Sequence, residues 1–161
     1  MASELKVDKI FNAGGDQDSG INLATNDTIK FDIATSTKAT MASTGIVTIV
    51  GEGGTNTINL QQGLAKFWVR WNGTGTAAEN DAFNSSGLTD NGTGSTTFGF
   101  TTNMGNANYS LTTSNSSVEA NNSQTNIVAA ATSTIEMGTR NGGGSLADTS
   151  LNSGQICGDL A

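Results

Sequence analysis

Proline and histidine are absent from this 161-residue sequence, and cysteine occurs once, at Cys157. Without histidine, the chain cannot form a Ser-His-Asp triad or a zinc site that uses imidazole. A single cysteine cannot form a disulfide within these residues, and no histidine or lysine stands beside it in sequence to activate its thiol. The lack of proline leaves the backbone amides free to donate hydrogen bonds to β-ladders.

Positive charge is scarce as well. The sequence has 7 lysines and arginines against 14 aspartates and glutamates, which gives a net charge of −7. Nucleic acids and anionic membrane surfaces are bound by clustered cations, so we expect neither as a partner. No apolar run approaches the roughly 18 residues of a membrane span, and the opening MASELKVDKI lacks the apolar centre of a signal peptide. We therefore expect no membrane insertion.

Two pairs of acidic residues are spaced like a metal site or a catalytic site, but neither pair is strong evidence for such a site. Asp16 and Asp18 in GDQDSG are spaced like calcium ligands, but no glutamate follows at the required distance, which favours a plain turn. Glu79 and Asp81 could be a carboxylate pair for glycoside hydrolysis, although sequence neighbours seldom have that geometry. We predict no catalytic residue, no metal and no cofactor, and hence no enzyme.

Large apolar residues are few, since leucine, isoleucine, valine and phenylalanine together make up roughly a fifth of the chain. Charged residues are also only 13%, which argues for an ordered chain and against disorder. A single copy would bury little apolar surface, at about 25 cal/mol per Å². We therefore expect identical copies to complete a shared core.

Short runs in which apolar and polar residues alternate predict β-strands along the whole chain. In the first third these runs are residues 5–11, 29–33, 46–50 and 58–60, and we expect 29–33 to be half-buried. The polar residues 35–45 fit either a loop or a weak strand. Residues 125–140 are the one candidate helix, but their threonine and serine content favours strands. Residues 141–154 are expected to be a loop before a final strand.

The character of the sequence changes near Gln61 and Gln62, where small residues give way to longer strands with aromatics. We place a domain boundary there, between an N-terminal anchor or stem of short strands (1–62) and a C-terminal β domain (63–161). The predicted fold class is all-β, with a slender N-terminal β segment followed by a β-sandwich-like head.

The stretch AKFWVRWNGTGT, residues 65–76, holds both tryptophans of the chain. In a strand, Phe67, Val69 and Trp71 share one face, which reads as a core face. Trp68 then lies between two cations, Lys66 and Arg70, on the other face. That face has three interpretations. Trp68 is a surface residue half covered by the two cationic side chains, or it packs in a subunit interface, or it is a platform on which a sugar stacks. Enrichment of aromatics and arginine at interfaces favours a subunit interface at Trp68 and Arg70.

Three successive segments, AKFWVRWNGTGT, AFNSSGLTDNGTG and FGFTTNMGNANYSL, cover roughly Ala65–Leu111. In order and spacing they resemble tail-fibre-like virion structural proteins of tailed bacteriophages, which carry A-K-A-W-V-x-F-N-G-T-G-T followed by similar motifs. The opening MASELKVDKI resembles the M-x-x-x-L-K-V-D-x-I start of many marine phage fibre-like proteins. The chain differs from the pattern at Phe67, where a small residue is usual, and at Trp71, where phenylalanine is usual. It is also shorter than many members.

The resemblance implies a virion protein without enzymatic activity, assembled in the bacterial host cytoplasm as an intertwined homotrimer. A short fibre or spike that contributes to host attachment fits the length. The alternatives are a capsid decoration protein that stabilises the head and, more weakly, a carbohydrate-binding module. Expected partners are further copies, other tail or capsid proteins, and a host surface glycan.

These functions predict two more sets of residues. The virion anchor, by strand addition to a partner sheet, would be Leu5, Val7, Ile10 and Phe11. Exposed receptor loops would be centred on Asn80, Asn84, Asn91 and Asn141.

Overall fold

The computed structural model describes residues 7–11, 19–24, 28–51, 54–116 and 124–160. The protein is all-β, as predicted, and it divides into two compact units, Met1–Gln61 (unit 1) and Gln62–Ala161 (unit 2). This division lies within one residue of the boundary expected from the change in sequence character.

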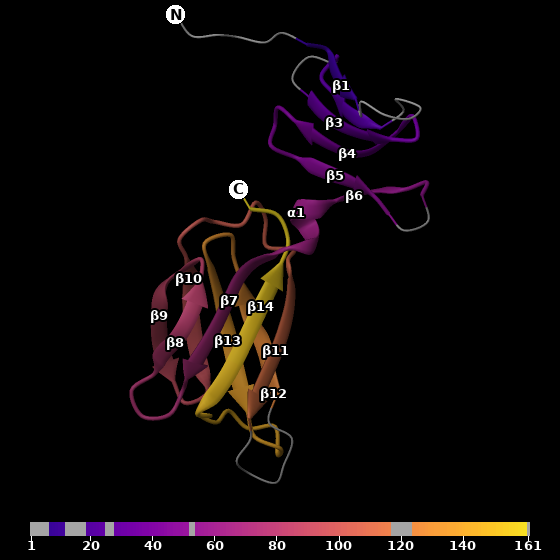
Figure 1. Cartoon of the computed structure of the whole chain (residues 1–161). Helices are drawn as coiled ribbons and strands as arrows, with labels where there is room; N and C mark the ends of the chain where they lie inside the picture. Colours follow the sequence, from indigo (N-terminus) through magenta and orange to yellow (C-terminus); the bar gives the residue numbers. More distant parts are fainter. Residues whose placement is uncertain (1–6, 12–18, 25–27, 52–53, 117–123, 161) are drawn as a thin grey trace, which may run out of the picture. The chain divides into compact units, whose positions relative to one another are not determined.

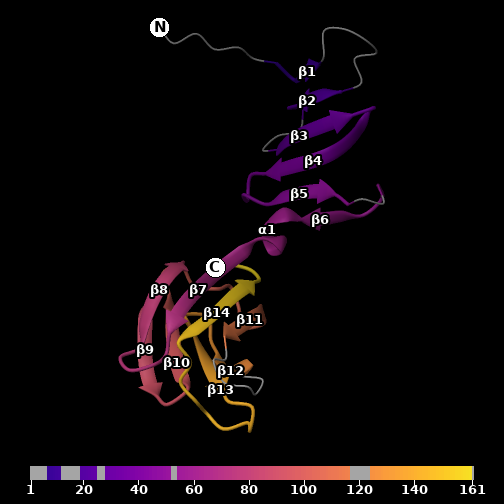
Figure 2. The same ribbon diagram turned by 60° about the horizontal axis from the view of Figure 1, so that its bottom comes forward.

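Unit 1 is one antiparallel sheet whose strands follow each other in chain order, β1-β2-β3-β4-β5-β6 (Figure 2). The strands are β1 Lys9–Phe11, β2 Gly20–Asn22, β3 Thr28–Ile33, β4 Ser36–Ala42, β5 Val47–Val50 and β6 Thr57–Asn59. Strand β4 resolves the segment that the sequence left open between loop and strand. The two residues that join β3 to β4, Ala34 and Thr35, have φ of 50° and 61°. Positive φ at both central residues is what a tight hairpin requires, here without glycine or asparagine.

The two faces of this sheet differ in polarity. Cross-strand pairing places Lys9, Asn22, Lys30, Thr40, Thr48 and Asn59 in one polar row. Asp32 lies on the same face and accepts hydrogen bonds from the Thr37 hydroxyl (2.7 Å) and the Asn22 amide (3.1 Å). These two hydrogen bonds hold the pKa of Asp32 below its usual value. The opposite face is apolar and is described below.

A single turn of helix, α1 (Leu60–Gly63), follows β6. The Asn59 side-chain oxygen accepts a hydrogen bond from the Gln61 amide (2.9 Å) and so caps the helix start. No helix among the described residues has the length and apolar content that crossing a membrane requires.

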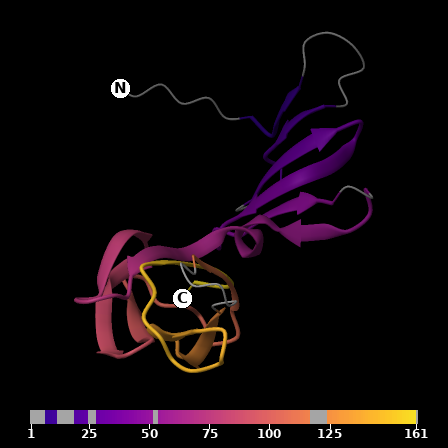
Figure 3. The same cartoon turned by 90° about the horizontal axis from the view of Figure 1, so that it is seen from below.

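Unit 2 is a β-sandwich of two four-stranded antiparallel sheets, ordered β12-β13-β10-β9 and β11-β14-β7-β8 (Figure 1). Its strands are β7 Ala65–Asn72, β8 Ala78–Phe83, β9 Ser85–Gly92, β10 Ser95–Phe100, β11 Ser110–Ser116, β12 Gln124–Ala130, β13 Thr134–Arg140 and β14 Leu151–Cys157. Seen from below in Figure 3, these strands surround a common interior. The preference for strands over a helix at residues 125–140 is confirmed. The loop expected up to residue 154 was wrong, because β14 already begins at Leu151.

The interior of unit 2 is an apolar core. Its buried members are Phe67, Val69, Trp71, Phe98, Phe100, Met104, Tyr109, Ile135, Met137 and Ile156. Aromatic rings meet edge to face across the two sheets, with centroid distances of 5.0 Å for Trp71–Phe98 and 5.1 Å for Phe67–Phe100. Such pairs add to the stabilisation from burial alone. Unit 2 therefore has a core of its own. The shortage of core-forming residues that the composition indicates applies to unit 1.

The tyrosine in this core is the only one in the chain, which makes it a clean probe. The Tyr109 hydroxyl lies 3.2 Å from the backbone oxygens of Ala131 and Thr134, to which it can donate. Burial raises the pKa of Tyr109 above its ordinary 10.0. Because the folded state favours the protonated phenol, stability is full below the unfolded-state pKa and is lost as pH rises through the folded-state pKa.

We expect ultraviolet titration of the folded protein to show tyrosinate forming above the ordinary range, and in step with unfolding. Tyr109→Phe should remove this absorbance change and cost about 1 kcal/mol of stability through the lost hydrogen bond. A phenol that titrates in its ordinary range while the protein stays folded would contradict the buried environment.

Two glycines with nearly equal backbone angles allow a second test. Gly94 has φ +66° in the β9–β10 turn, and a Cβ there would lie 2.5 Å from both the Ala147 nitrogen and the Thr139 oxygen. Gly75 has φ +68°, and a Cβ there would meet nothing within 4 Å. We expect Gly75→Ala to cost about 1–2 kcal/mol from the left-handed backbone alone. Gly94→Ala should cost about 1–3 kcal/mol more, because the packed backbone must also move.

Urea denaturation of the two variants measures the difference directly. Equal losses of stability would contradict the close approach of residues 139 and 147 to the turn.

Candidate functional site

The most unusual surface of unit 1 is an uncovered apolar sheet face. Residues that pair directly across the strands put two rows on one face, which together we call the apolar face: Ile10, Ile21, Phe31, Ala39, Ile49 and Ile58 in one row, and Ile29, Met41 and Val47 in the other. Phe31 is 40% exposed and Ile58 is 54% exposed. No described residue of unit 1 is buried, because the described part of unit 1 is one sheet without a second layer of its own.

The burial of β3 reverses the expectation from its sequence. Ile29, Phe31 and Ile33 were predicted to be the buried side of a half-buried strand, but all three are exposed. Their polar neighbours Thr28 and Lys30 are more covered. The alternation was read correctly, but it does not show whether the apolar side of the strand is covered within one chain.

The predicted virion anchor is only partly within the described residues. Leu5 lies outside them, and Val7 is exposed. Ile10 belongs to the apolar face, opposite Ile21, whereas Phe11 lies on the polar face, where the Lys9 ammonium is 5.7 Å from its ring centroid. Strand β1 is an edge of the sheet and pairs only with β2 among the described strands. An edge strand of this kind can pair with a strand of another protein.

In unit 2, strand β7 presents its two tryptophans to different surroundings. Phe67, Val69 and Trp71 point into the core, with Trp71 fully buried, as the alternation predicted. Trp68 is 36% exposed on the outer face of its sheet, and Arg70 is exposed beside it. Lys66, expected to flank Trp68 on this surface, is instead buried, with its ammonium 3.3 Å from the Leu64 carbonyl oxygen. The outer face therefore has one cation next to Trp68.

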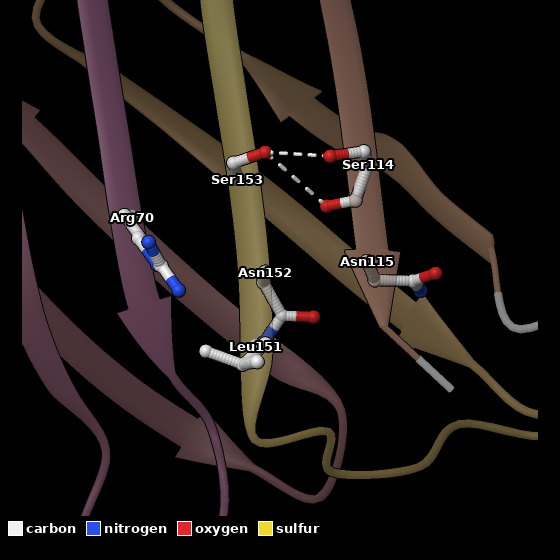
Figure 4. Close-up of a pocket in the computed structure, with 6 residues that line it drawn as sticks. All are labelled: Arg70, Ser114, Asn115, Leu151, Asn152 and Ser153. Atoms are coloured by element: carbon white, nitrogen blue, oxygen red, sulfur yellow. Dashed lines mark hydrogen bonds between the residues drawn. The ribbon is translucent and has the colours of Figure 1, made fainter. Parts of the chain in front are cut away.

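Two hollows on this outer face join into a groove, which we call the β7–β14–β11 groove. They have volumes of about 370 and 380 Å³ and share Arg70, Ser114 and Ser153. One hollow extends to Leu151 and the other to Trp68, and the latter is also lined by Thr112 and Gln155. Figure 4 shows the first hollow, with residues from β7, β14 and β11 around it. Strands far apart in the sequence thus form one surface.

Some polar side chains of this groove are hydrogen-bonded within the chain, among them Asn115 and Asn152, and others are not. The Ser114 and Ser153 hydroxyls lie 2.7 Å apart, and the Arg70 side chain leans toward β14 in Figure 4. In the part of the chain that the structure describes, the side chains of Arg70, Gln155 and Thr112 make no hydrogen bond or ion pair. These side chains are available to a ligand.

The outer face of the other sheet contrasts with this arrangement. The Asn91 amide donates to the Thr97 hydroxyl (2.8 Å), and the Ser95 hydroxyl donates to the Glu136 carboxylate (2.6 Å). These polar side chains are hydrogen-bonded to one another.

The predicted receptor loops are mostly not loops. Asn80 lies in β8 and Asn91 lies in β9, so their placement in loops was wrong. Asn84 joins these strands with φ +60°, and its amide donates to the carbonyls of Lys66 (2.9 Å) and Thr102 (3.0 Å). This structural role has no sequence signature.

The fourth of these residues, Asn141, does lie in an exposed turn. There its side-chain oxygen accepts hydrogen bonds from the amides of Gly143 (3.0 Å) and Ser145 (3.1 Å). Its side chain is therefore committed to holding the turn.

The acidic residues considered for chemistry do not converge. Asp16 and Asp18 lie outside the described residues. A register shift in the β7–β8 pairing sets Glu79 opposite the inward Trp71 and Asp81 opposite the outward Arg70. The Glu79 carboxylate also accepts a hydrogen bond from the Ser85 hydroxyl (2.5 Å). Across the described ranges, no three acidic, cysteine or histidine side chains are grouped as metal ligands.

Comparison of the chain with protein families, with curated proteins and with solved structures found no match. The apolar face and the β7–β14–β11 groove are thus the two features from which a function can be inferred.

Proposed function

We propose that this protein is a non-enzymatic structural protein of a bacteriophage particle, in which three copies associate into a short fibre or spike on the particle surface. The observation that carries the proposal is the apolar face of unit 1. A protein of this kind acts by assembling and by presenting a surface, and it needs no catalytic group.

Self-association follows from the energetics of the apolar face. A sheet with one apolar face normally buries that face against another layer. Full burial of an isoleucine or phenylalanine side chain contributes about 1.5–3 kcal/mol, so burial of several per copy is a strong drive to associate. Further copies of the same chain offer a matching apolar surface, while the row of lysine, asparagine and threonine on the opposite face can stay in water.

The number of copies and the location come from the resemblance to phage fibre-like proteins. The segments that carry it, Ala65–Leu111, extend from the start of β7 into β11 of unit 2. Three copies can place their apolar faces around one axis. In this arrangement the edge strand β1 docks on another virion protein, and unit 2 carries the surface exposed to the host.

Two measurements test the proposal. Light scattering should give three times the 16.4 kDa mass of one chain, and gold-labelled antibody should mark particles at a tail or at a spike. A stable monomer at micromolar concentration would overturn the assembly. Labelling spread evenly over the head would favour a capsid decoration protein over a spike. Particles without label would overturn the virion assignment.

A further inference from the structure

We propose that the β7–β14–β11 groove binds an acidic saccharide, with Trp68 stacking on a sugar ring and Arg70 pairing with the carboxylate of the sugar. The binding itself is independent of the proposed assembly. Its biological meaning, attachment to a host surface, rests on the proposed function.

The dimensions of the groove suit an extended ligand. Its lining runs from Gln155 to Leu151 on β14, which spans about 13 Å at the usual rise of a strand. Hollows of about 370 and 380 Å³ at its two ends each fall in the range of small-molecule sites. A chain of more than one sugar ring can therefore lie along the strands.

The aromatic group stands at one end of the groove. Trp68 is directly opposite Phe83 on the neighbouring strand, and Phe83 is exposed. An exposed aromatic ring offers an apolar face together with a polar edge. A sugar ring has the same division, with C–H bonds on its faces and hydroxyls around its rim, so it can stack on Trp68 while its hydroxyls reach past the ring.

Hydroxyl and amide groups follow in the next positions. Gln155 lies beside Trp68 in the strand pairing and is itself opposite Thr112, so the three side chains cross the sheet in one row. The adjacent row contains Arg70, Ser153 and Ser114. A neutral amide and several hydroxyls are suitable partners for sugar hydroxyls, since each can donate and accept hydrogen bonds.

Arg70 determines the charge of the ligand. Its guanidinium can hold a carboxylate through two parallel hydrogen bonds. Asp81 lies opposite Arg70 in the strand pairing, but no ion pair joins them among the described residues, and the Asp81 carboxylate accepts a hydrogen bond from the Ala82 amide (2.9 Å). An exposed arginine that forms no ion pair with a described carboxylate can pair with an anionic ligand, and this local charge is what selects an acidic sugar.

The same residues were first interpreted as a subunit interface, and the structure favours a ligand groove over it. Aromatic residues and arginine are enriched at protein interfaces, but the core of an interface is mostly apolar and closely complementary in shape to its partner. This surface is hollowed, and the residues shared by its two hollows are Arg70, Ser153 and Ser114, which follow one another across β7, β14 and β11. The interface is therefore the competing outcome of the test.

The experiment is a calorimetric titration of the full chain with oligosaccharides of galacturonic, glucuronic or N-acetylneuraminic acid, each beside its methyl ester. We expect at least one acid to bind. Its ester keeps the rings and loses the charge, and should bind at least about tenfold more weakly. Arg70→Gln should cause the same loss. Arg140→Gln is the matched control, because it removes an equal charge from the other sheet and should leave binding unchanged.

Trp68→Ala should abolish binding and Trp68→Phe should retain part of it, with the mass of the assembly unchanged in both. Binding by none of the acids, or equal binding by the Arg70 and Arg140 variants, would overturn the proposal. So would an assembly that dissociates on Trp68→Ala without any saccharide binding, since Trp68 would then be an interface residue. A monomeric wild type that binds the acid would instead overturn the proposed assembly alone.

Discussion

Trp71→Ala is expected to lower the free energy of unfolding of unit 2 by about 3–5 kcal/mol, the cost of deleting a large core side chain and leaving a cavity. Trp71 is fully buried and packs edge to face on Phe98 at 5.0 Å. A domain of this size has a total stability of roughly 5–15 kcal/mol. The variant should therefore lose a large fraction of the stability of unit 2.

Trp68→Ala is the matched control, because it removes the same side chain from the outer face of the same strand. Its cost should be below about 1 kcal/mol, as for most surface substitutions. Urea titration followed by far-ultraviolet circular dichroism compares the two without depending on tryptophan fluorescence. Similar losses for both variants would show that the inward and outward sides of β7 had been assigned incorrectly.

The double substitution Phe31→Ser and Ile49→Ser is expected to dissociate the assembly while unit 2 stays folded. Both residues lie in the six-residue row of the apolar face, each opposite Ala39. If three copies bury this face, each copy loses two large apolar contacts, at about 2–5 kcal/mol for each side chain. Association should then weaken by more than about a thousandfold. The core of unit 2 contains none of these residues, so its unfolding transition should remain.

The control is the double substitution Thr40→Ser and Thr48→Ser, which changes two residues of the polar face, on β4 and β5 of the same sheet. It should leave the mass unchanged. Light scattering gives the mass of each variant, and circular dichroism shows whether the transition of unit 2 survives. A Phe31 and Ile49 variant that remains trimeric would place the contact between copies elsewhere in the chain.

Some features of the fold were readable in the sequence because they depend on local alternation. In β7, a period of two places Phe67, Val69 and Trp71 on one side, and this was enough to predict the core face. The all-β class followed from similar alternation and from the absence of helix signals. Other local features carried no signal. The β3–β4 turn uses Ala34 and Thr35, which are not turn-forming residues, so the hairpin could not be read from its sequence.

The candidate sites were harder to predict from the sequence, because each depends on contacts between residues that are distant in the chain. Asn84 was expected in a receptor loop, yet it bridges Lys66 and Thr102, and only the packing of the chain shows this. Trp68 and Arg70 could be singled out from their unusual neighbours in sequence. Their groove needs Ser153 and Ser114 from strands that lie more than forty residues away, and period-two alternation does not specify which strand pairs with which.

By itself, the sequence determined that the chain is made of strands, where its character changes, and which side of β7 is apolar, since these follow from the order of neighbouring residues. Only the tertiary structure decided that the apolar residues of unit 2 enclose one another while those of unit 1 are left uncovered. The physical reason is that alternation defines two faces of a strand, whereas burial depends on whether a second layer lies over one of them.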